Sequence, residues 1–254
     1  MRFASLGSGS EGNGLVVQVG DTCLLLDCGF SVADTVLRLA RLGLAPANLT
    51  GVVVTHEHSD HVGGVARLSR RYNLPVWLTF GTLHCLAEEV MSACLHIIDC
   101  HAQFSIGDVQ VFPFPVPHDA REPVQFVFSD GVHRLGVLTD LGGSTPHVEA
   151  CLSPVDALVL ECNHDRDMLF SGPYPTGLKE RVGGRFGHLD NQAAAGLLSR
   201  IDRSRLQHII AAHLSQQNNT PVLARQALAG VLNCSDDWIG IAEQNDGFGW
   251  RGIC

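Results

Sequence analysis

The pattern of apolar and polar residues divides the chain into two rounds, each β-rich at first and helical afterwards. In the first round, short apolar or alternating runs predict strands at Arg2–Leu6, Leu15–Val19, Thr22–Asp27, Gly51–Thr55 and Val76–Leu78. Helical spacing predicts a helix that follows the cap Ser31 and runs to Leu42, and further helices at Val62–Tyr72 and Gly81–Met91. Gly20–Asp21 lies between two of the strands and indicates a hairpin turn.

The second round repeats this order. Strands are expected at Ile97–Ile98, Val109–Phe114, Val124–Phe128, Val132–Leu138, Ala157–Leu160, His208–Ala211, Trp238–Ala242 and Gly249–Ile253. Helices are expected at Asn191–Ile201, capped by Asp190, and from Thr220–Pro221 onwards. Two similar halves, each a sheet with helices outside, predict an α/β protein with a four-layer αββα sandwich. No segment resembles a linker, so we expect a single domain over residues 1–254.

Composition agrees with a globular protein and narrows its class. The hydrophobic fraction is 45% and the charged fraction 17%. No apolar run approaches the ~20 residues of a membrane span, and the stretch after Met1 is too short for a signal peptide. Nine scattered cysteines without a C-x-x-C pair fit neither a disulfide scaffold nor a zinc ribbon. We therefore expect a cytoplasmic protein with reduced, mostly buried cysteines and no membrane partner.

Net charge and histidine content point in different directions. The net charge of −9 argues against generic affinity for nucleic acid. It does not exclude a polyanionic substrate, because two divalent cations would add about four positive charges at the site itself. Thirteen histidines are more than packing requires, and several lie in tight polar clusters.

The strongest chemical signal is His56-x-His58-x-Asp60-His61, between an apolar strand and a helix. Residues two apart in an extended segment point the same way, so His56 and His58 can face one ion. The turn into the helix brings Asp60 and His61 round to a second. Imidazole and carboxylate together suit zinc, manganese or iron. The alternative, a solvated histidine-rich loop, would leave four clustered ligands without a purpose.

Three more candidate ligands each follow the end of an apolar strand: His118, Asp140 and His213. Singly, each is as well explained as an ordinary surface or core-edge residue. Their shared position makes all three stronger candidates together.

The motif H-x-H-x-D-H after an apolar strand resembles the signature of the metallo-β-lactamase superfamily. Leu24-Leu-Leu-Asp27-Cys-Gly29 resembles its first motif, and the three strand-end residues match later motifs in order. The resemblance implies a metallo-β-lactamase fold with two divalent ions, Zn or Mn. It implies one ion on His56, His58 and His118, a second on Asp60, His61 and His213, and Asp140 as the bridge. It gives Asp27 the role of orienting the His loop without touching a metal.

Two such ions create a bridging hydroxide and polarise the electrophile, which serves esters, thioesters, lactams and phosphodiesters alike. Gly187-His188-Leu-Asp-Asn191, before an Ala-rich helix, resembles the proton-donor histidine motif of zinc phosphodiesterases such as the tRNA 3′-processing enzymes. There, a Glu at a strand end, matched here by Glu161, orients the histidine. The resemblance makes His188 the general acid, worth ~10²–10⁴-fold. The alternative is a helix N-cap region with an incidental histidine. The expected catalytic residues are thus Asp60, Glu161 and His188.

Candidate substrate contacts are weaker. Lys179, Arg181 and Arg185, interleaved with glycines, form the most basic stretch of an acidic chain. They predict a flexible cationic loop that captures phosphate, or alternatively a solvated surface loop. Further candidates are Ser8 and Asn13 in the glycine-rich loop, and His164 after the Glu161 strand.

Two other signals carry less weight. Gly7-x-Gly9-x-x-Gly12 matches the dinucleotide fingerprint, but that fingerprint requires a helix where this sequence predicts a strand. Cys162 is interpreted as a buried strand-end thiol rather than a nucleophile.

The most specific resemblance is to the YycJ/WalJ-like branch of the superfamily. It rests on the segments Ser5–Asn13, Leu160–Asp165, Gly187–Asn191 and Ala212–Asn219. That branch is associated with DNA 5′→3′ exonuclease activity, so the resemblance implies a nuclease acting on DNA rather than RNA. The inserted domain of larger superfamily nucleases is missing, so a nucleic-acid channel would come from a homodimer or from short loops. The rival hypotheses are a small-molecule acyl hydrolase (thioesterase, lactonase or lactamase) on the same metals, and a metal-binding scaffold without catalysis.

Overall fold

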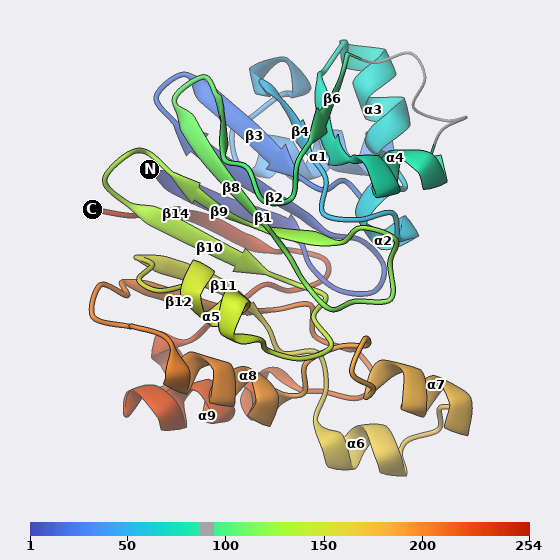
Figure 1. Cartoon of the computed structure of the whole chain (residues 1–254), viewed down its shortest axis with the longest axis vertical. Coiled ribbons are helices and arrows are strands. Elements are labelled where there is room, and N and C mark those ends of the chain that lie inside the picture. Colours follow the sequence, from blue (N-terminus) through green and yellow to red (C-terminus); the bar gives the residue numbers. More distant parts are fainter. Residues whose placement is uncertain (87–93) are drawn as a thin grey trace.

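The computed structural model describes residues 1–86 and 94–254, and within these ranges the strands form two seven-stranded sheets that lie face to face (Figure 1). The first sheet has the order β14-β1-β2-β3-β4-β5-β6 and the second β13-β12-β11-β10-β9-β8-β7. The first consists of β1 (Arg2–Gly7), β2 (Gly14–Val19), β3 (Thr22–Leu26), β4 (Gly51–Val53), β5 (Val76–Thr79), β6 (Leu95–Ile98) and β14 (Phe248–Gly252). The second consists of β7 (Phe104–Ile106), β8 (Val109–Pro115), β9 (Val124–Ser129), β10 (Arg134–Leu138), β11 (Ala157–Glu161), β12 (His208–Ala212) and β13 (Gly240–Ile241).

Helices cover the outer faces of both sheets. On the first sheet lie α1 (Val32–Arg41), α3 (Val65–Tyr72) and α4 (Phe80–Leu86), and on the second α5 (Pro146–Cys151), α8 (Asn191–Arg200) and α9 (Pro221–Leu232). Three short helices lie apart from these layers: α2 (Ser59–Val62), α6 (Arg166–Ser171) and α7 (Thr176–Val182). Two 3₁₀ turns, Pro46–Asn48 and Asp236–Trp238, complete the described elements. The predicted αββα sandwich is confirmed.

Alternation along the strands creates three apolar layers. On β2, Leu15 and Val17 pack between the sheets, while Val16 packs on the other face with Leu39 of α1 and Leu68 of α3. A third layer joins the second sheet to α8 and α9. Each fully buried aliphatic or aromatic side chain contributes about 1.5–3 kcal/mol, so the sheets form a rigid frame for the residues at their edges.

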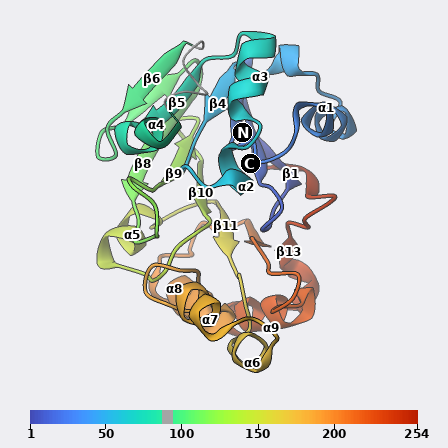
Figure 2. The same ribbon diagram turned by 90° about the vertical axis from the view of Figure 1, so that its right-hand side faces the viewer.

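Strand direction places the functional residues. Each sheet is antiparallel in one part and parallel in the other, with β3, β4, β5 and β6 parallel in the first and β10, β11, β12 and β13 parallel in the second. Carboxyl ends of parallel strands meet at one edge, where open α/β sheets place their ligands. Figure 2 faces the side of the molecule on which α2 and α7 lie, one above the other.

Several sequence-based boundaries need correction. The helix expected at Val62–Tyr72 is two helices, α2 and α3, separated by Gly63–Gly64. The strand expected at Trp238–Ala242 begins at Gly240, because Trp238 belongs to a 3₁₀ turn. The predicted helix Gly81–Met91 starts one residue earlier, and its part beyond Leu86 lies outside the described residues.

The cysteine prediction is half right. All nine cysteines are free, but only Cys23, Cys28 and Cys162 are buried. Short strands and helix ends leave the others at or near the surface, so the expectation of mostly buried thiols is wrong. Among the helices of the described ranges, none has the length and apolar character that crossing a bilayer requires.

Candidate metal centre and active-site cleft

Three candidate residues follow strand ends in an unusual backbone conformation. Asp27 after β3, Asp140 after β10 and His213 after β12 have φ angles of 60°, 57° and 54°. A left-handed conformation is uncommon for residues other than glycine and costs of order 1–3 kcal/mol. Each one turns the chain sharply where the strand ends, so that three side chains from different strands meet at one edge.

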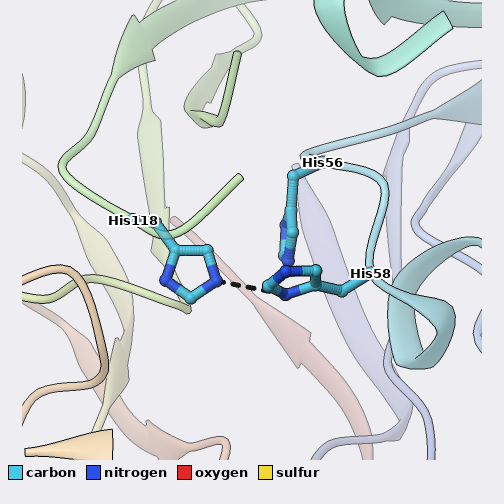
Figure 3. Close-up of side chains that lie close together, drawn as sticks. All are labelled: His56, His58 and His118. Atoms are coloured by element: carbon cyan, nitrogen blue, oxygen red, sulfur yellow. Dashed lines mark hydrogen bonds between the residues drawn. The ribbon is translucent and has the colours of Figure 1, made fainter. Parts of the chain in front are cut away.

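The first group of candidate ligands contains three histidines (Figure 3). His56 and His58 come from the loop after β4, and His118 from the loop after β8. Nε2 of His118 lies 3.3 Å from Nδ1 of His58. The other nitrogens of His56 and His118 are occupied: Nδ1 of His118 lies 3.0 Å from the Gly187 carbonyl oxygen, and Nδ1 of His56 lies 3.0 Å from Oγ1 of Thr55. Both rings therefore present Nε2 to the centre of the group.

The second group contains Asp60, His61 and His213. Oδ2 of Asp60 lies 3.3 Å from Nε2 of both histidines. Asp140 lies between the two groups, with its carboxylate 2.9 Å from Nε2 of His61, 3.6 Å from Nε2 of His213 and 4.0 Å from Nε2 of His118. This is the place expected for a bridging carboxylate.

Asp27 holds the histidine loop in position. Its Oδ2 accepts a hydrogen bond from Oγ1 of Thr55 at 2.8 Å and lies 2.8 Å from Nδ1 of His61. Its Oδ1 accepts from the backbone N–H of Thr55 at 2.8 Å. A proton on Nδ1 of His61, held by Asp27, leaves Nε2 to face the centre beside Asp140. Thr55 passes the same constraint to His56. A carboxylate behind a ligating histidine commonly fixes its tautomer in this way.

The unsatisfied atoms of this centre fit divalent cations. Nε2 of His56 and Oδ2 of Asp140 are buried without a hydrogen-bond partner. Buried polar groups of this kind are costly unless paired or coordinated. Burial raises the pKa of Asp140, but His213 and His61 outweigh it and hold the pKa well below its ordinary value. An ionised carboxylate among imidazole lone pairs is a donor set that suits zinc or manganese.

A fourth carboxylate lies beside this centre. Glu161, at the end of β11, is fully buried and places Oε1 2.7 Å from Nδ1 of His188 and 3.5 Å from Nδ1 of His213. Its Oε2 accepts hydrogen bonds from the backbone N–H groups of Leu141 and Leu189. Burial raises the pKa of Glu161, but His188 and after it His213 outweigh burial and lower the pKa to about 2.

The pKa of His188 is shifted in the opposite direction. Burial lowers its pKa, but Glu161 and then Asp140 outweigh burial, so the pKa is raised above its ordinary value. With Nδ1 engaged by Glu161, the ring's Nε2 is the atom left to exchange a proton. Glu161 therefore favours the protonated form of the His188 imidazole at the wall of the centre.

A cleft of about 350 Å³ opens over both groups. Its lining includes His58, Asp60, Asp140, His188 and His213, and on the α7 side Tyr174, Leu178 and Arg181. Nε of Arg181 lies 2.6 Å from Oδ2 of Asp119, which also lines the cleft. The cleft thus joins the candidate ligands to the α7 side, where Arg181 is the cationic residue of the lining.

Comparison with known proteins agrees with this geometry. Residues 22–209 match the family model described as the beta-lactamase superfamily domain. The chain is 35% identical over 243 residues to the exodeoxyribonuclease YycJ of Bacillus anthracis, covering 91% of this chain and 89% of that protein. The chain belongs to the metallo-β-lactamase superfamily, in its YycJ/WalJ-like branch.

A second relative supports this assignment, and a solved structure shows the same fold. It is 31% identical over 245 residues to the exodeoxyribonuclease WalJ of Streptococcus pneumoniae, covering 94% of this chain and 91% of that protein. The crystal structure of Zn(2+)-bound PqqB from Methylobacterium extorquens superposes with a TM-score of 0.75 at 18% identity, over 100% of both chains. The latter similarity shows the shared fold.

The cationic stretch of this metallo-β-lactamase chain differs from the expected flexible loop. Lys179 and Arg181 lie on α7, and only Arg185 lies in the loop after it. Nζ of Lys179 donates to the Phe170 carbonyl oxygen at 2.8 Å, so this side chain is tied to α6. Two short helices replace the loop, and only α6 has a side-chain cap, from Asp165. Apolar periodicity does not predict them because they bury so little.

The remaining predicted substrate contacts lie behind the ligands. Ser8, Asn13 and His164 are buried and do not line the cleft. Oγ of Ser8 accepts from the backbone N–H of His213, and Nδ2 of Asn13 lies 3.1 Å from Nε2 of His61. His164 lies 3.3 Å from the Asn163 amide oxygen. Their position argues against direct contact with substrate and indicates support of the ligand loops.

Sequence reasoning missed three residues of the site: Thr55, Asp119 and Tyr174. Thr55 and Asp119 directly adjoin His56 and His118, so inspection of each motif's neighbours could have found them. Tyr174 lies in no recognisable motif. Two discounted signals behave as predicted: β2 follows the glycine-rich loop, with no helix for a pyrophosphate, and the Cys162 thiol is fully buried, which raises its pKa.

Proposed function

We propose that this protein is a dinuclear metal-dependent phosphodiesterase that degrades nucleic acid, and specifically a DNA exonuclease. The observation that carries the proposal is His188, held by the buried Glu161 at the wall of the metal centre. The relatives named as exodeoxyribonucleases, matched over nearly their whole length, favour DNA as the polymer. The 5′→3′ direction rests on family resemblance.

In this proposal His56, His58 and His118 would hold one cation, Asp60, His61 and His213 would hold the other, and Asp140 would serve both. When bound, a pair of divalent cations would supply an activated water nucleophile and neutralise phosphate charge. Asp27 and Thr55 keep the histidine nitrogens aligned, and the apolar layers behind them exclude solvent.

The role of His188 follows from the leaving group. Cleavage of a DNA phosphodiester expels a sugar alkoxide, which is a poor leaving group unless it takes a proton as the bond breaks. His188 can supply that proton because Glu161 stabilises the imidazolium and raises the pKa of the ring. A thioester or a lactam needs this acid less, so the buried Glu161–His188 pair favours the phosphodiesterase over the rival acyl hydrolase.

A comparison of leaving groups tests the proposal. Wild type and His188→Ala are assayed with Mn²⁺ or Zn²⁺ on single-stranded and duplex DNA labelled at either end, and on bis-p-nitrophenyl phosphate. Nitrophenolate leaves without a proton, so His188→Ala should lose about 10²–10⁴-fold on DNA and far less on the chromogenic ester. Thioester and lactone substrates serve as the comparison set.

The proposal is wrong if wild type cleaves neither phosphodiester with either metal, or if it turns over a thioester or lactone instead. The end at which label is released reports the direction of attack. Light scattering of the same preparation tests the separate prediction of a homodimer.

A further inference from the structure

The pair of helices α6 and α7 buries almost nothing. Leu169 is the one buried residue of α6, and none of the seven residues of α7 is buried. Both helices project from one corner of the sandwich (Figures 1 and 2). Most helices in proteins are stabilised by packing an apolar face against a core, so this segment has another use.

Apolar side chains of this segment face solvent. Phe170 is 50% exposed, Phe186 is 49% exposed and Leu178 is 36% exposed. They are three of the nine large apolar side chains exposed in the described part of the chain, gathered within 17 positions. Clustered exposed apolar groups beside polar residues mark binding surfaces.

Each exposed ring has a guanidinium beside it. Arg166 lies 5.9 Å from the ring centre of Phe170, and Arg185 lies 5.0 Å from that of Phe186. The stretch 166–187 carries four cationic and two acidic side chains, in a chain with 17 cationic and 26 acidic ones. It is therefore the part of an acidic protein that attracts a polyanion.

The same segment continues into the cleft. Tyr174, Leu178 and Arg181 line the cleft on the α7 side. The Phe186 carbonyl oxygen accepts a hydrogen bond from the backbone N–H of Asp119 at 2.9 Å, which places Phe186 beside the His118 loop. A chain lying along the segment would thus arrive at His188.

We propose that Phe170, Tyr174 and Phe186 form a stacking surface for unpaired bases, so that the DNA strand to be cut enters the cleft with its terminal bases unpaired. The proposal rests on the nuclease function proposed above and adds how the end of the polymer is held. Stacking on aromatic rings beside a cationic track is the usual way to hold single strands without reading their sequence. Such rings contribute little to the binding of a duplex, because its bases are already stacked on each other.

The test compares two oligonucleotides with the same phosphates, one carrying bases and one built from abasic units. Binding to metal-loaded protein is followed by fluorescence anisotropy, with terminal phosphorothioates to slow cleavage. Wild type should bind the base-containing strand roughly tenfold or more tighter than the abasic strand. Phe170→Ala with Phe186→Ala should remove that preference, and Phe170→Leu should weaken it while keeping apolar bulk. Trp238→Ala, which removes an aromatic ring that is 43% exposed in the 3₁₀ turn after α9, should leave it unchanged.

The outcomes separate this proposal from the proposed function. Equal affinity for the two strands, or an unchanged preference in the double variant, overturns the stacking surface even if DNA is cleaved. Base-dependent binding without hydrolysis of any DNA keeps the surface and removes the nuclease. If the double variant instead converts a dimer to a monomer in light scattering without changing base preference, the patch is an interface between copies and the proposal is wrong. Melting temperatures near that of wild type exclude misfolding as the cause.

Discussion

Nδ1 of His188 lies 2.7 Å from Oε1 of Glu161, a carboxylate with no exposed surface. Glu161 is also fixed by two backbone N–H groups, so it holds the imidazole without moving itself. This contact joins the second sheet to the loop before α8 and decides the charge of the proposed general acid.

Glu161→Gln keeps the shape of the side chain and removes its charge. Burial then lowers the pKa of His188 against Asp140 alone, because Glu161 is the main group that raises it. We expect the alkaline limb of the kcat profile on DNA to move down by roughly one pH unit, about a tenfold loss of rate at alkaline pH. Glu149→Gln, at a carboxylate bound to the exposed Arg200, should leave the profile unchanged. An unmoved alkaline limb in the Glu161 variant would show that this residue does not control the acid.

Metal-free protein should lose stability as the pH rises. Burial lowers the pKa of His213, but Asp140, Asp60 and Glu161 outweigh it and raise the pKa to about 10. A raised pKa in the folded state gives stability that is complete below the unfolded value near 6.5 and lost as the pH approaches 10. EDTA-treated protein should therefore melt at a lower temperature at pH 9.5 than at pH 6.5. A metal-loaded sample should not show this decline, because the cation replaces the proton.

Thr55→Val removes the hydroxyl group and leaves the volume of the side chain nearly unchanged. Thr55 links Nδ1 of His56 to Asp27, so the variant should bind metal about 10–100-fold more weakly. Competition with a chelating dye measures this. Thr35→Val is the matched control, since Thr35 is equally buried and hydrogen-bonded but lies in α1. It should lower the melting temperature without changing metal affinity, and equal metal loss in both variants would remove the special role of Thr55.

Arg181→Gln should weaken DNA binding through phosphate contact. Arg181 lines the cleft and is 63% exposed, so its charge can reach a substrate. We expect a several-fold rise in KM, a small change in kcat, and a slope of log affinity against log salt that is shallower by about one. Arg200→Gln is the control, because Arg200 makes a similar ion pair on α8. If the two variants have the same salt slope, Arg181 does not contact phosphate.

Gly29→Ala should disrupt the metal centre by displacing the ligand loop. A Cβ at Gly29 would lie 1.8 Å from the Asp60 carbonyl oxygen, so the ligand loop would have to move. We expect loss of metal binding and a destabilisation of several kcal/mol, of the order seen for severe overpacking. Gly230→Ala in α9, where a Cβ meets nothing within 4 Å, should instead raise stability by about 0.5–1 kcal/mol. Zinc content and denaturant unfolding would check both changes.

The sequence was most informative where chemistry requires a dense pattern. His56, His58, Asp60 and His61 stand together in the chain, and the strand before them is wholly apolar, so both the loop and its place at a sheet edge were predictable. The strand-end positions of Asp140 and His213 followed from the same reasoning. The structure adds their left-handed backbone, which apolar periodicity cannot indicate.

The helices absent from the sequence-based prediction are α5, which has a recognisable start, and α6 and α7, which have little apolar periodicity. The Thr-Pro pair that predicts α9 also occurs at Thr145–Pro146, where it starts α5, so that helix was predictable. By contrast, α6 and α7 bury almost nothing, and their amphipathic spacing is too weak to separate them from a loop. Burial of Ser8, Asn13 and His164 depends on contacts with residues distant in the chain, which no local pattern contains.

The absence of any buried side chain in α7 has a consequence for how this fold can change its substrate. A corner whose one buried side chain is Leu169 can be lengthened, recharged or exchanged at little energetic cost, provided that Leu169 is kept, while the strand ends that carry the ligands stay as they are. Grafting a different hairpin between Arg166 and Arg185 is therefore a direct route to an enzyme of altered selectivity on an unaltered catalytic frame.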